Sequence, residues 1–145
     1  MIQRIQSVFL LLAALAFAGK LFAPVATAVE EFGTIMADGV FQTTESLWLT
    51  IFALVGLIVS FFNIFLYRRR KSQMRFCMTA NLFAIIWAAV GFYMVLELEV
   101  KAEGITEIIH SWAFLLTLAA VVFNSLAYYF IRKDERLVRS MNSLR

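Results

Sequence analysis

The sequence has almost no cysteine and almost no proline. Its one cysteine among 145 residues is Cys77. A single thiol cannot form an internal disulfide or a Cys-x-x-Cys pair, which excludes quinone-coupled thiol oxidoreductases. The basic segment beside it predicts a reduced, buried thiol, with palmitoylation of a cysteine near the membrane as the alternative. The single proline is compatible with long, uninterrupted helices.

The sequence also lacks the motifs of common enzyme classes. It contains no Gly-x-Ser-x-Gly, no His-Glu-x-x-His and no Gly-rich phosphate loop. Its only histidine is His110, so two histidines of one chain cannot ligate a haem. Glu107 and His110 have the spacing of a di-iron ligand pair, but in one copy only. We therefore expect a protein that is not an enzyme and has no metal or other cofactor.

Long apolar stretches dominate what remains. The chain is 62% hydrophobic, well above the roughly 45–50% of soluble domains. A helix needs about 20 apolar residues to cross a bilayer. This length predicts an all-α fold: one integral membrane four-helix bundle over residues 1–145, with short loops and a C-terminal amphipathic helical tail. The expected spans are 5–28, 47–67, 76–96 and 108–131, followed by the tail 132–145. A cleaved signal peptide is the alternative for the first span, but apolar residues continue past its candidate cleavage site at 16–18.

Eleven of the thirteen basic residues lie on one side of these spans. They are Arg4, the loop residues Arg68, Arg69, Arg70, Lys71 and Arg75, and the tail residues Arg132, Lys133, Arg136, Arg139 and Arg145. Under the positive-inside rule, this bias predicts a multi-pass protein with both termini in the cytoplasm. The same bias explains the net charge of +3 without a nucleic-acid partner.

Three asparagines lie within the expected spans. Asn63, Asn81 and Asn124 would be about 8–12 Å inside the cytoplasmic boundary, judging from the helical rise. Polar groups in hydrocarbon are costly and need partners. We expect an intramembrane polar layer in which the amides bond between helices. The alternative is a polar pocket for a ligand or a headgroup.

Lys20 is the one basic residue close to the outer end of the first span. Its long stem predicts that the ammonium extends to the headgroups, with an ion pair to Glu45 or Glu97 as the alternative. None of the ten acidic residues lies within a span, which argues against a proton-coupled transporter. The loop 29–46 mixes apolar and acidic residues and is expected at the outer interface.

The tail is predicted to continue the last span as a helix. Leu137, Met141 and Leu144 share one face of it. One hypothesis rests this face and the basic residues on anionic headgroups. The other makes the tail a docking helix for a cytoplasmic partner. The residues expected to make these contacts are Arg132, Lys133, Arg136, Leu137, Arg139 and Met141.

Two segments carry a resemblance to a known family. Residues 1–14, which begin Met1-Ile2-Gln3-Arg4, and residues 131–140 are similar to the two ends of uncharacterised four-span inner-membrane proteins of Bacteroidota. The resemblance implies a Gram-negative inner membrane. That family has no assigned activity, so the resemblance supplies no catalytic residues.

We therefore expect a non-enzymatic accessory or scaffold subunit of a larger inner-membrane assembly. The alternative is a transporter-like protein that binds a small molecule or a lipid through the asparagine layer. Expected partners are membrane lipids, including anionic headgroups. A second membrane protein and a second copy of the chain are further options.

Overall fold

The computed structural model describes residues 2–28, 38–67, 69–102 and 108–143. Along the chain, the elements are α1 (Ile2–Phe22), β1 (Pro24–Ala28), β2 (Val40–Gln42), the 3-10 helix η1 (Thr43–Glu45), α2 (Leu47–Phe65), α3 (Arg70–Ala102), β3 (Ile108–His110) and α4 (Trp112–Ser143). Half of the predicted loop 29–46, together with Arg68, Glu107, Leu144 and Arg145, lies outside the described residues.

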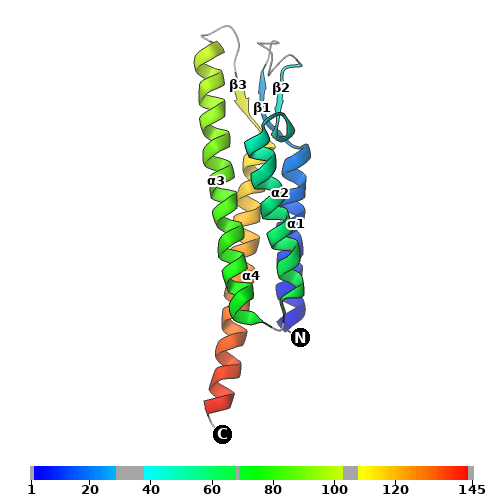
Figure 1. Cartoon of the computed structure of the whole chain (residues 1–145), viewed down its shortest axis with the longest axis vertical. Helices are drawn as coiled ribbons and strands as arrows, with labels where there is room; N and C mark the ends of the chain where they lie inside the picture. Colours follow the sequence, from blue (N-terminus) through cyan, green and yellow to red (C-terminus); the bar gives the residue numbers. More distant parts are fainter. Residues whose placement is uncertain (1, 29–37, 68, 103–107, 144–145) are drawn as a thin grey trace.

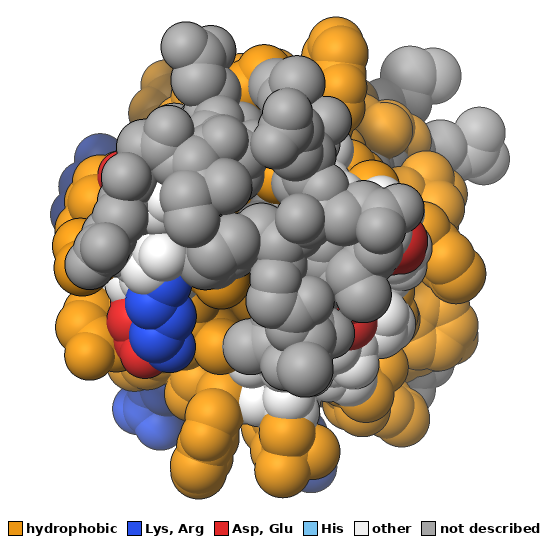
Figure 2. All heavy atoms as spheres, turned by 90° about the horizontal axis from the view of Figure 1, so that it is seen from above, with side chains coloured by type: hydrophobic (Ala, Val, Ile, Leu, Met, Phe, Trp, Pro, Cys, Tyr) orange, Lys and Arg blue, Asp and Glu red, His pale blue; other side chains and the backbone are white. Residues whose placement is uncertain are grey.

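The four helices form an elongated bundle (Figure 1). In it α1 packs against α2 and α4, and α3 packs against the same two helices. All four are long and apolar enough to cross a membrane, as expected for a multi-pass membrane protein. Hydrophobic side chains surround the bundle when it is viewed along its length (Figure 2). The predicted all-α four-helix bundle is thus confirmed.

A small sheet at one end of the bundle was not predicted. β1 pairs antiparallel with both β2 and β3, in the order β2-β1-β3. The predicted first span, 5–28, is therefore wrong at its end, because α1 stops at Phe22. A proline ring clashes with the carbonyl four residues earlier, so Pro24 cannot continue the helix. The predicted fourth span, 108–131, is wrong at its start, because Ile108–His110 forms a strand.

The helices that correspond to the second and third predicted spans also differ in length from the prediction. α2 ends at Phe65, two residues before the predicted end. α3 has 33 residues and extends beyond the predicted span 76–96 at both ends. α4 continues to Ser143, which confirms that the tail is helical. We call the end with the strands the sheet end. The end with the α2–α3 connection and the tail is the basic end.

The core consists of three clusters along the bundle. The cluster at the sheet end contains large side chains, among them Trp87, Phe41 and Leu49. The middle cluster is Ala16, Phe17, Ala80, Ala84 and Ala120. The cluster at the basic end is Leu10, Cys77, Ala127 and Ile131. A Cβ on Gly56 would lie 2.2 Å from Cε1 of Phe17, so only glycine lets this ring pack against α2.

Candidate functional site

The structure places two of the three predicted asparagines in the interior. Asn63 and Asn124 are fully buried. Asn81 is partly exposed, and its Nδ2 donates to Oγ of Ser125, at 3.1 Å, between α3 and α4. Asn81 is thus bonded across helices as expected, but to a serine. Within the described residues, neither side-chain polar atom of Asn124 has a hydrogen-bond partner.

Two glutamines complete a set of buried amides that the sequence reasoning missed. Gln6 on α1 is 5% exposed and Gln73 on α3 is 2% exposed, so each helix contributes one buried amide. Nε2 of Gln73 donates to the main-chain oxygen of Asn63, at 3.2 Å. Nδ2 of Asn63 donates to Sγ of Cys77, also at 3.2 Å. Gln73 was missed because it precedes the predicted span, although it lies four residues before the buried Cys77.

Lys20 contradicts its prediction. Its side chain is fully buried and does not extend to headgroups. The ammonium nitrogen lies 4.4 Å from the ring centroid of Phe17 and 4.8 Å from that of Trp87. Within the described part of the chain, this nitrogen has no hydrogen-bond partner. The ion pair expected with Glu97 is also absent there, because Glu97 pairs with Lys101, at 2.6 Å. Two aromatic faces therefore hold the cation.

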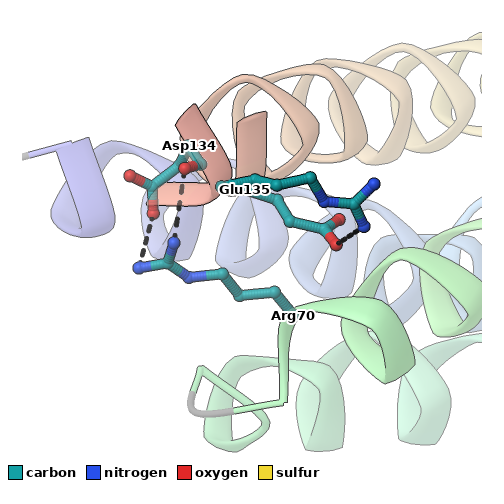
Figure 3. Close-up of polar contacts among 4 residues, drawn as sticks. Arg70, Asp134 and Glu135 are labelled. Carbon is teal, nitrogen blue, oxygen red and sulfur yellow. Dashed lines mark hydrogen bonds and ion pairs between the residues drawn. The ribbon is translucent and has the colours of Figure 1, made fainter. Parts of the chain in front are cut away.

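An ion pair joins α3 to α4 at the basic end (Figure 3). Nη2 of Arg70 lies 3.0 Å from Oδ2 of Asp134, and Nη1 donates to the main-chain oxygen of Asp134, at 3.3 Å. The two side chains are only 25% and 15% exposed. On α4 itself, Nη2 of Arg139 lies 3.4 Å from Oε1 of Glu135. The first pair fixes the base of the tail against the start of α3.

The remaining basic residues of the predicted set stay on the surface. In the α2–α3 segment they are Arg69, Lys71 and Arg75, and on the tail they are Arg132, Lys133, Arg136 and Arg139. Arg70 alone of the described set is half-buried and joined to another helix. These basic side chains therefore lie on the surface of the basic end.

The tail leaves the bundle without a companion helix. Past Ile131, the last core residue, α4 still contacts the start of α3 through Asp134 and then runs on beyond the ends of the other helices (Figure 1). The twelve residues that follow Ile131, up to Ser143, correspond to about 18 Å of helix. Leu137 is 47% exposed and Met141 is 63% exposed. The tail thus presents apolar side chains that no other described element covers.

Within the described ranges, no group of three or more His, Cys, Asp and Glu side chains could hold a metal ion. The Glu107–His110 pair falls partly outside these ranges.

One family model, described as a domain of unknown function (DUF4293), matches residues 2–144. Comparison with curated proteins and with solved structures finds no match for the chain.

Proposed function

We propose that this chain, which belongs to the DUF4293 family of unknown function, is a non-enzymatic accessory or scaffold subunit of a larger assembly in the bacterial inner membrane. The observation that carries the proposal is the helical tail of α4. It extends along the bundle beyond the other three helices and exposes Leu137 and Met141 (Figure 1).

The charge distribution supports a cytoplasmic tail. Eleven of the thirteen basic residues belong to the N-terminal segment, the α2–α3 segment and the tail. Positively charged segments are retained on the cytoplasmic side during insertion. Both termini are therefore proposed to lie in the cytoplasm. Reporter fusions after residues 40, 72, 102 and 145 should read outside, inside, outside and inside. A cytoplasmic signal at residue 40 would overturn this orientation.

The direction of the tail favours a protein partner over headgroups. A helix that rests on headgroups lies in the plane of the interface. The tail instead continues in the direction of the bundle (Figure 1). In a membrane crossed by the bundle, its far end would therefore extend away from the surface. Most helical stability comes from packing of an amphipathic face, and a segment this short gains little by itself. A partner that covers Leu137 and Met141 would supply that packing.

A transporter-like function is the second candidate, supported by the polar core. Gln6, Asn63, Gln73 and Asn124 bury one amide on each helix. Buried polar groups within a membrane bundle are costly, so each is a candidate functional residue. A solute bound among these amides would satisfy Asn124. Asn124→Leu should then release that solute and leave the tail partner bound.

Native purification in mild detergent followed by mass spectrometry tests both candidates. The unmodified chain should retain a protein partner. Leu137→Ser/Met141→Ser should lose that partner, because it removes the exposed apolar face. Glu135→Gln/Arg139→Gln is the matched control, since it changes two residues on the opposite face of the same turns and should retain the partner. If no protein is retained by the unmodified chain, or if both variants lose it equally, the scaffold proposal is wrong.

A further inference from the structure

Two grooves flank the base of the tail, directly past Ile131. The first, of about 320 Å³, is lined by Met74, Tyr128, Arg132, Glu135, Arg136 and Arg139. The second, of about 440 Å³, is lined by Tyr129, Arg132, Lys133, Arg136, Leu137 and Ser140. Arg132 and Arg136 belong to both, so the grooves lie on either side of one ridge that these two arginines form on α4.

The grooves carry an excess of positive charge. Four basic residues line them, against one acid, Glu135, which already pairs with Arg139. The structure gives Arg132, Lys133 and Arg136 no hydrogen bond or ion pair within the described part of the chain, and all three are exposed. Arg70, by contrast, has its charge compensated by Asp134. The uncompensated charge at this site is therefore concentrated on three neighbouring residues.

The position of the grooves matches the boundary between hydrocarbon and headgroups. Ile131 is the last residue of α4 in the core, and the basic residues follow at once. Tyr128 and Tyr129, one in each groove, precede it on the apolar side. Tyrosine rings concentrate at membrane interfaces because they combine an apolar body with a polar tip. Each groove thus has a tyrosine on the side of the span and basic residues on the side of the tail.

We infer that the two grooves form a single site for an anionic phospholipid with two phosphate groups joined by a short polar linker. Guanidinium groups bind phosphate oxygens in pairs, so the arginine ridge can engage one phosphate in each groove. Each volume corresponds to about ten or more liquid water molecules, which is enough for a phosphate and its glycerol. The tyrosines contact the start of the acyl chains. This site requires membrane insertion, but it does not require the proposed protein partner.

The lipid would divide the tail into two parts. The base, residues 132–140, carries the tail residues that line the grooves, binds the headgroup and stays at the interface. The far part, with its exposed Met141, stays free for a partner. The two sites can therefore be lost separately, and one set of variants distinguishes them.

The test measures lipid retention on the purified full-length chain by native mass spectrometry. Diphosphatidylglycerol, with two phosphates, is compared with phosphatidylglycerol, with one, and with zwitterionic phosphatidylethanolamine. We expect one diphosphatidylglycerol per chain, half-retained at a concentration at least about tenfold lower than for phosphatidylglycerol. Arg132→Gln/Arg136→Gln should weaken retention by about tenfold or more, since it removes charged hydrogen bonds to both phosphates.

The matched control is Arg69→Gln/Lys71→Gln. It removes the same charge from residues that line neither proposed groove. They belong to a neighbouring groove near the start of α3, which shares only Glu135 with the first, and their loss should change retention by less than about twofold. Arg132→Lys/Arg136→Lys keeps the charge but loses the paired geometry, and should fall between the unmodified chain and the glutamine variant. Unchanged helical content by circular dichroism shows that each variant is folded, so a loss of lipid reports on the site itself.

Three results would overturn the inference. Equal loss in the control would mean diffuse attraction to the basic end. Equal retention of lipids with one and two phosphates would remove the two-phosphate site. Displacement of the lipid by inorganic pyrophosphate at similar concentration would assign the grooves to a soluble anion. If Met141→Ser, which changes a residue outside both grooves, loses the partner but keeps the lipid, the lipid site stands independently of the proposed scaffold role.

Discussion

The two ends of the bundle are built in opposite ways. At the sheet end, β1 pairs with both β2 and β3, and the main-chain nitrogen of Ser111 donates to the oxygen of Val25, at 3.1 Å. At the basic end, one ion pair between Arg70 and Asp134 joins α3 to α4, and α4 then continues alone. Main-chain bonds between several elements close the first end. The second end leaves polar and apolar side chains available, so contacts with other molecules are expected there.

The cores beneath the two ends differ in the same way. Beneath the sheet, large side chains such as Trp87 surround Lys20, the only charged residue among the buried side chains described. Toward the basic end, smaller side chains accompany the buried Asn63, Gln73 and Cys77, which bond to one another. One half surrounds an ammonium group with aromatic faces, and the other joins amides and a thiol by hydrogen bonds, although the side-chain oxygens of Asn63 and Gln73 have no partner within the described residues. Substitutions beneath the sheet should therefore change stability through packing and desolvation of a charge, and substitutions toward the basic end through hydrogen bonding.

The largest expected effect is at Lys20. Lys20→Ala should lower the free energy of unfolding by about 2–5 kcal/mol, because it leaves a cavity beneath the sheet. Lys20→Met fills the same space without a charge that must be desolvated, and should equal or exceed the unmodified chain in stability. Denaturation of the detergent-solubilised protein measures both. If methionine proves as destabilising as alanine, the contacts of the ammonium with Phe17 and Trp87 outweigh its desolvation.

The junction between the two halves should be almost as sensitive. Gly56→Ala should cost about 1–3 kcal/mol, because the new methyl group overlaps the Phe17 ring. Gly91→Ala is the matched control: its Cβ would lie 3.6 Å from the nearest atom, on Leu49. The control should be neutral or stabilising by up to about 1 kcal/mol through helix propensity. Equal losses in thermal unfolding would show that ring overlap is not the cause.

The polar contact between α3 and α4 should give a smaller effect. A double-mutant cycle of Asn81→Leu and Ser125→Ala should show a coupling of about 0.6 kcal/mol, typical of hydrogen bonds between membrane helices. The stability losses of Asn81→Leu and Asn124→Leu should be additive, since the side chain of Asn81 bonds to Ser125 and not to Asn124. Coupling in the second pair but not in the first would reverse this assignment.

The length of the apolar segments predicted the four helices, because a membrane span requires about 20 consecutive, mostly apolar residues. The strands were not predicted, since three to five residues give no periodic pattern and their pairing joins segments far apart in sequence. The burial of Lys20 could have been predicted in part: it lies three residues after the buried Phe17, on the same helical face. The prediction instead assumed an open membrane surface at that level. The small sheet closes this end.

The smallest expected effect is a pH dependence at the sheet end. Glu45 ends η1, just before the span that α2 provides. Partial burial raises the pKa of its carboxyl above the ordinary value near 4.5; a backbone hydrogen bond from Gln42 lowers the pKa, and the Asp38 carboxylate raises it.

Because the pKa of Glu45 is raised, the folded state binds more protons than the unfolded state just above pH 4.5, so stability should fall as the pH rises through that window. The change should stay below about 0.5 kcal/mol, because the side chain is exposed and water screens it. Glu45→Gln should flatten the thermal-unfolding profile in this window, and Asp38→Asn should flatten it only partly. If Glu45→Gln leaves the slope intact, the dependence belongs to other groups, and the charge of Glu45 does not contribute to the stability of the sheet end.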